Sequence, residues 1–144
     1  RKDSIVRLNS ARSVLLNRKS MSDLSHITNF VQLTPTVGTA GQPRAEYFVD
    51  IAAAGYDVVI NLAMADSDHA LPNEGHLVAS LGMTYIHMPV NFQAPRAADV
   101  ARFIVLMRSL DDQKDDHKIF VHCALNLRVS AFMYHYLKLP YSKS

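Results

Sequence analysis

Short apolar runs alternate with segments of helical periodicity along most of the chain. Residues 57–64 (DVVINLAM) and 118–122 (KIFVH) are apolar on both faces, which predicts strands inside a parallel sheet. Residues 83–90 (MTYIHMPV) predict a further strand. Residues 31–43 are expected to be extended, with a break at Pro35. Apolar residues at a spacing of three or four predict helices at 21–30, 44–55, 75–82, 96–110 and 128–139.

This alternation of strands and helices predicts an α/β fold with three α/β/α layers and a mainly parallel central sheet. Ligands of such folds bind beyond the carboxyl ends of the strands. The loops 64–75, 91–96 and 123–128 follow the three predicted strands, so we expect them to meet at one edge of the sheet and to form the functional site.

The length of 144 residues suits one domain with its own core, which we place at residues 21–144. Residues 1–20 carry six Lys or Arg against Asp3 alone and are predicted to be a basic helical extension, with a targeting leader as the alternative. Because the basic charge is confined to this segment and lacks interleaved aromatics, nucleic acid is not an expected partner. No apolar run approaches the ~18 residues of a membrane span. A soluble protein is therefore expected, with the cytoplasm favoured and an exported mature form left open.

The only cysteine, Cys123, ends a predicted strand and is followed at once by a predicted helix. It can form no intramolecular disulfide, so it is a buried apolar residue, a metal ligand or a nucleophile. In a strand-to-helix turn, successive N–H groups converge and the helix N-terminus adds partial positive charge, which favours an anion and a thiolate. The guanidinium of Arg128 suits two oxygens of a phosphoryl group. The residues expected to supply the N–H groups are Ala124, Leu125, Asn126, Leu127 and Arg128.

The stretch VHCALNLRVSAF, residues 121–132, resembles the phosphate loop of the protein tyrosine and dual-specificity phosphatase superfamily, whose pattern is His-Cys, five residues, Arg. Residues 38–63 are similar to the entry helix and first buried strand of that fold, in particular to those of a small bacterial branch related to the domain attached to some beta-lactamase-like hydrolases. The likeness covers roughly residues 27–139. It implies a phosphatase in which Cys123 forms a cysteinyl-phosphate intermediate, without metal or other cofactor. A phosphorylated substrate of unknown class is implied, and phosphate or sulfate can occupy the site.

The loop departs from the superfamily pattern in its length and in two side chains. Four residues, not five, separate Cys123 from Arg128, so the loop must be tighter. Asn126 stands where the superfamily usually has glycine, and asparagine tolerates the positive φ that this position would need. Ser130, the expected hydroxyl of the phosphate loop, follows Arg128 by two positions, whereas the superfamily places a hydroxyl directly after the arginine.

The position of the general acid is also changed. The superfamily has an aspartate after the preceding strand, often four residues before a proline, and here Asn91 occupies that place before Pro95. An amide can hydrogen-bond a leaving group but cannot protonate it, and loss of a general acid typically costs ~10²- to 10⁴-fold in rate. Asp66 and Asp68 both follow the strand at 57–64 and are the candidate substitute acids. Asp66 is slightly preferred.

Three functions fit these features. The first is a slow cysteine-dependent phosphatase, the second a phosphate- or oxyanion-binding module with little or no turnover, and the third a rhodanese-like sulfurtransferase whose cysteine carries a persulfide. His122 either orients the cysteine loop or satisfies the end of a buried strand. No metal is expected, because the histidine and acidic spacings match no zinc signature. Substrate identity and oligomeric state are left open by the sequence.

Overall fold

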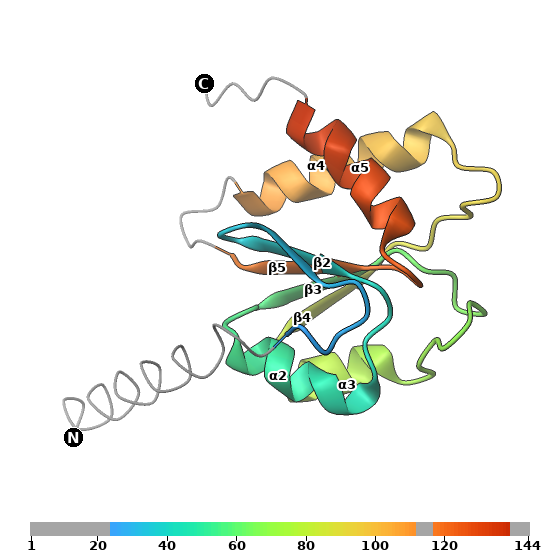
Figure 1. The fold of residues 1–144 in the computed structure, drawn as a ribbon. Helices are drawn as coiled ribbons and strands as arrows, with labels where there is room; N and C mark the ends of the chain where they lie inside the picture. The colour runs from blue at the N-terminus through green and yellow to red at the C-terminus, as the bar shows by residue number, and fades with distance from the viewer. Residues whose placement is uncertain (1–23, 112–116, 139–144) are drawn as a thin grey trace.

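The computed structural model describes residues 24–111 and 117–138, and the predicted basic helix at 1–20 lies outside them. A five-stranded sheet in the order β1-β2-β5-β3-β4 forms the centre of this part of the chain (Figure 1). Strands β2, β5, β3 and β4 are parallel, and β1 is antiparallel to β2. The strands are β1 (Val31–Thr34), β2 (Val37–Ala40), β3 (Val58–Asn61), β4 (Thr84–His87) and β5 (Ile119–His122).

The central strand β5 and its neighbour β3 are the strands that the apolar runs predict. Every residue of β3 and of β5 is buried, and the two strands pair in register from Val58 opposite Ile119 to Asn61 opposite His122. A strand covered on both faces can be apolar throughout, which explains why neither alternates with polar residues. Strand β4 lies at the edge of the sheet and is only partly buried.

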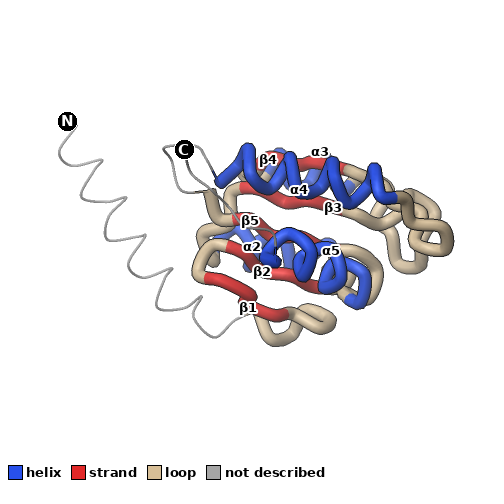
Figure 2. Tube along the Cα trace, turned by 90° about the horizontal axis from the view of Figure 1, so that it is seen from above, coloured by secondary structure: helices blue, strands red, loops and turns tan. Residues whose placement is uncertain are grey.

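Helices cover both faces of the sheet, so the predicted α/β/α class is confirmed. Helices α2 (Phe48–Ala53) and α3 (Glu74–Ser80) lie on one face, with the short 3₁₀ helix η1 (Ala45–Tyr47) before α2. Helices α4 (Ala97–Asp111) and α5 (Leu127–Lys138) pack together on the other face. Seen from above, α4 lies over the β3–β4 side and α5 over the β2–β5 side (Figure 2).

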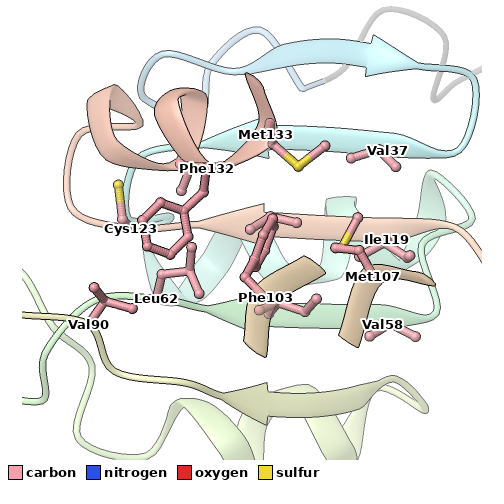
Figure 3. Close-up of a cluster of buried hydrophobic side chains, with 13 residues drawn as sticks. Val37, Val58, Leu62, Val90, Phe103, Met107, Ile119, Cys123, Phe132 and Met133 are labelled. Carbon is pink, nitrogen blue, oxygen red and sulfur yellow. The ribbon is translucent and has the colours of Figure 1, made fainter. Parts of the chain in front are cut away.

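The sheet separates two hydrophobic clusters. The cluster under α4 and α5 contains Phe103, Phe132 and Cys123, and Cys123 lies at one end of it with its sulfur directed into the bend between β5 and α5 (Figure 3). The cluster under α2 and α3 includes Phe48 and Phe120. Because side chains alternate along a strand, consecutive residues of β5 contribute to different clusters.

Two predicted elements differ in the structure. Residues 24–30, the described part of the helix predicted at 21–30, form turns, in which Ile27 N–H bonds Leu24 O at 3.0 Å and Phe30 N–H bonds Ile27 O at 3.1 Å. These turns bury Leu24 and Ile27 without a helix, so the helical spacing over so few residues was not specific. Residues 31–40, predicted to be simply extended, form the β1–β2 hairpin, with Pro35 in its turn.

Candidate active site

Three loops at the carboxyl ends of β3, β4 and β5 surround a cavity of about 650 Å³. These are the loops that the sequence predicts to meet, and they lie together at one end of the strands in Figure 1. The side chains that line the cavity are those of Ala63, Met64, Asp66, Ser67, Asp68, His69, Val90, Asn91, Phe92, Gln93, Cys123, Ala124, Leu125, Leu127 and Arg128. The residues predicted from the sequence to be nucleophile, clamp and acid therefore share one cavity.

Cys123 directly follows β5 and lines this cavity. Its backbone N–H still bonds Ala40 O of β2 at 3.3 Å, so the sheet fixes the residue from one side. The side chain is only 2% exposed and contacts the apolar cluster under α5. A ligand must therefore reach the sulfur through the cavity.

The peptide groups after Cys123 are held by hydrogen bonds to their carbonyl oxygens. Ala124 O accepts from the backbone N–H of Gln42 at 2.9 Å, and Leu125 O accepts from the side-chain amide of Asn29 at 2.8 Å. The next N–H groups, those of Leu127 and Arg128, lie in the first turn of α5, where no earlier carbonyl of the helix is available to them. Such N–H groups and the helix dipole favour an anion.

Asn126 adopts the conformation predicted for it. Its φ is 68°, in the left-handed region that asparagine tolerates better than most residues. Its side-chain amide points away from the cavity and donates to Asn29 O at 2.7 Å and Thr39 Oγ1 at 3.2 Å. Asn126 O accepts from the hydroxyl of Ser130 at 2.7 Å. In this structure Asn126 and Ser130 thus brace the loop from behind, whereas the other loop residues named from the sequence line the cavity.

Gly41 lets the end of β2 approach the loop closely. A Cβ atom at this position would lie 2.7 Å from Ala124 O, a backbone atom that cannot rotate away. Gly41 also forms an isolated antiparallel bridge with Leu125. The short loop is therefore attached to the sheet through β2.

Arg128 lies in the first turn of α5, exposed at the cavity. Its guanidinium lies over the ring of Phe92, 4.9 Å from the ring centroid. Phe92 belongs to the loop before α4 and also contacts Phe132 edge-on, at 5.6 Å between centroids. Phe92 is a site residue that the sequence did not single out.

The candidate acid positions all line the same cavity. The side-chain oxygen of Asn91 accepts the backbone N–H of Gln93 at 3.1 Å, which fixes this amide in a turn. Asp66 and Asp68 lie on the opposite loop and are exposed. The structure thus brings both candidate substitutes to the rim.

A buried polar network lies behind the loop, on the face of the sheet opposite Cys123. His122 is fully buried, and its Nε2 lies 2.7 Å from Oε2 of Glu74, which is also buried. The other carboxylate oxygen of Glu74 accepts from the side-chain amide of Gln42 at 2.7 Å. Burial alone would raise the pKa of Glu74, but the hydrogen bonds from His122, Gln42 and Tyr85 and the charge of His122 outweigh it, so this pKa lies below its usual value. Burial raises the pKa of Tyr85 to about 12.

The sequence places Glu74 only among acidic residues whose spacing fits no metal site, and Gln42 only in a turn. Of the residues that the structure describes, no three His, Cys, Asp or Glu side chains come close enough together to hold a metal ion. In the same ranges, no helix has the length and apolar character needed to cross a membrane.

Comparison with solved structures places the chain in a family. The crystal structure of a candidate phosphatase, DUF442, from Shewanella putrefaciens CN-32 is 37% identical to this chain with a TM-score of 0.74, and the match covers 81% of this chain and 74% of that one. The chain belongs to the DUF442 family. The sequence of the present chain matches no protein-family model and no curated protein.

Less similar structures share the fold of this DUF442 protein. A mutant form of Tk-PTP is 20% identical with a TM-score of 0.62, and the match covers 75% of this chain and 69% of that one. Pseudomonas aeruginosa TpbA in complex with phosphotyrosine is 14% identical with a TM-score of 0.57, covering 73% and 59%. The predicted protein tyrosine phosphatase-like fold is thus confirmed, and the closer likeness to domains attached to beta-lactamase-like hydrolases stays a prediction.

Proposed function

We propose that this protein is a cysteine-dependent phosphatase of low intrinsic rate. The observation that carries the proposal is the shared cavity, in which Cys123, Arg128 and the N-terminus of α5 lie at the carboxyl ends of parallel strands. The DUF442 relative described as a phosphatase supports the same reaction class.

The reaction would proceed through a covalent intermediate. The thiolate of Cys123 attacks phosphorus, and the bond from phosphorus to the ester oxygen breaks as that oxygen leaves with the electron pair. Arg128 and the N–H groups of the loop hold the remaining oxygens, where negative charge is concentrated in the transition state. Water then attacks the phosphocysteine, which releases inorganic phosphate and restores the thiolate.

This site is poorly equipped to protonate the leaving oxygen. Asn91 has no acidic proton to transfer, and its side-chain oxygen already accepts the N–H of Gln93. Asp66 lines the cavity and is the proposed substitute acid, with Asp68 beside it in the same loop. Without an efficient acid, esters with stable leaving groups such as p-nitrophenol are expected to react far faster than alkyl phosphates.

The test is the hydrolysis of p-nitrophenyl phosphate by the wild type and by Cys123→Ser, Arg128→Lys and Asp66→Asn. Cys123→Ser should abolish turnover, and a phosphorylated enzyme should be detectable by intact mass in the wild type after rapid acid quench. Arg128→Lys should lose most activity, since an ammonium cannot form the two parallel hydrogen bonds of a guanidinium. Full activity in Cys123→Ser would refute the mechanism. Phosphate binding without any phosphoenzyme would instead select a non-catalytic oxyanion-binding module.

A rhodanese-like sulfurtransferase is the other candidate enzyme, because its reaction makes no demand on the amide at Asn91. The thiolate of Cys123 would attack the outer sulfur of thiosulfate, and sulfite would leave with the electron pair of the broken S–S bond. Sulfite needs no proton to leave at neutral pH, so this reaction requires no general acid. Cyanide would then take the outer sulfur from the persulfide as thiocyanate. Formation of thiocyanate that depends on Cys123, without hydrolysis of p-nitrophenyl phosphate, would select this function.

A further inference from the structure

Glu74 is a buried carboxylate for which the proposed reaction has no use. It begins α3, lies on the opposite face of the sheet from Cys123 and is 3% exposed. A carboxylate buried to this extent is tolerated only when it is paired and hydrogen-bonded. The partners of Glu74 therefore indicate what it does, and two of them hold the loop after Cys123.

The first partner is His122. Its Nε2 lies 2.7 Å from Glu74 Oε2, and its Nδ1 lies 3.3 Å from the carbonyl oxygen of Cys123. A carboxylate and a carbonyl only accept hydrogen bonds, so an imidazole between them satisfies both when each ring nitrogen carries a proton. The remaining titratable group at this carboxylate is the hydroxyl of Tyr85 from β4, which stays neutral because burial raises its pKa to about 12. The imidazole is therefore placed to link Glu74 to the carbonyl of Cys123.

The second partner is Gln42. Its side-chain amide donates to Glu74 Oε1 at 2.7 Å, and its backbone N–H donates to Ala124 O at 2.9 Å. One carboxylate thus reaches, through two residues, the carbonyl groups of Cys123 and Ala124. In a trans peptide the N–H points opposite to the C=O. Holding these two carbonyls on the side of Glu74 turns the N–H groups of Ala124 and Leu125 toward the cavity that both residues line.

We infer that Glu74 is a positioning residue for anion binding: through His122 and Gln42 it holds the carbonyls of Cys123 and Ala124, and so aims the first two loop N–H groups into the cavity. The inference rests on the oxyanion-binding role proposed for the loop and does not depend on turnover. It also accounts for a loop with one residue fewer than the superfamily pattern, because the peptide orientations are fixed from behind by side chains outside the loop.

The test is Glu74→Gln in the full chain, with inorganic phosphate as the probe and isothermal titration calorimetry as the measurement. Glutamine keeps the shape but presents no carboxylate to His122, so the loop is held less firmly and affinity for phosphate should fall about tenfold. The ¹⁵N resonances of the His122 ring should also shift, because Nε2 loses its carboxylate partner. Glu46→Gln is the matched control, because Glu46 is an exposed glutamate of η1, and it should change neither.

A second variant separates positioning from a general loss of stability. Tyr85→Phe removes another hydrogen bond to the carboxylate of Glu74 but touches neither His122 nor Gln42. It should lower the melting temperature and leave phosphate affinity unchanged. Wild-type affinity in Glu74→Gln, or an equal loss of affinity in Tyr85→Phe, would overturn the inference. Absence of phosphate binding in the wild type would instead refute the proposed oxyanion site, and the inference with it.

Discussion

Asn91→Asp tests whether the site lacks only its general acid. The side-chain oxygen of Asn91 accepts the N–H of Gln93 at 3.1 Å, and a carboxylate oxygen can accept the same bond, so the loop should keep its shape. The new carboxyl would line the cavity with Cys123 and Arg128, where the residue already lies. The substitution therefore adds a proton donor with little other change.

The size of the gain follows from the exposure of the site. A positioned general acid contributes ~10²- to 10⁴-fold when protonated. Asn91 is exposed, so we give the new carboxyl an ordinary pKa of about 3.9, and at about pH 5.5 roughly one molecule in 40 carries the proton. The net gain should then be about 3- to 250-fold at that pH and should shrink toward neutral pH.

The assay compares p-nitrophenyl phosphate with an alkyl phosphate between pH 5 and 8. The alkyl ester should gain more, because its leaving oxygen depends more on protonation. Gln93→Glu is the control, since it adds the same negative charge to the same loop at another position, and it should give no gain. If Asn91→Asp leaves both esters unchanged at every pH while hydrolysis still depends on Cys123, the missing-acid hypothesis is wrong.

Three further predictions concern stability and are measured by chemical or thermal unfolding. Gly41→Ala places a Cβ 2.7 Å from Ala124 O and should cost about 1–3 kcal/mol, whereas Gly82→Ala, with nothing within 4 Å of its Cβ, should cost only the strain of its positive φ. Asn126→Ala should cost about 1–2 kcal/mol, because it combines a left-handed φ with loss of two hydrogen bonds, and an unchanged midpoint would contradict this. The lowered pKa of Glu74 means that its carboxylate stabilises the fold above its ordinary value of 4.5, and that this contribution is lost as pH falls through the folded pKa. Glu74→Gln should flatten that part of the acid-unfolding profile.

The sequence predicted the parts of the fold that depend on local pattern. Strands β3 and β5 are apolar on both faces because helices cover both sides of the sheet, and short β-branched runs of this kind are typical of interior parallel strands. The meeting of the three loops followed from the strand directions alone. The turns at 24–30 were missed because two buried residues three positions apart, Leu24 and Ile27, fit a turn as well as a helix.

The network behind the loop could not be predicted from the sequence. Glu74 and His122 are 48 positions apart, and a glutamate at the end of a polar stretch is ordinarily solvated. Only the packing of α3 against the sheet buries this carboxylate, and only burial requires it to find partners. Likewise, no local sequence feature predicts that the guanidinium of Arg128 lies over the ring of Phe92, because that contact depends on how the loop before α4 packs against α5.

The bridge between Gly41 and Leu125 has a consequence for protein engineering. Because this bridge and the bond from Gln42 to Ala124 extend the pairing of β2 beyond β5, the first half of the loop has a fixed registry with the strand beside it. Inserting one residue to imitate the longer superfamily motif would have to leave Ala124 and Leu125 in place and expand the chain between Asn126 and Arg128. There it would displace the left-handed turn that starts α5, so lengthening this loop requires grafting the neighbouring strand end together with it.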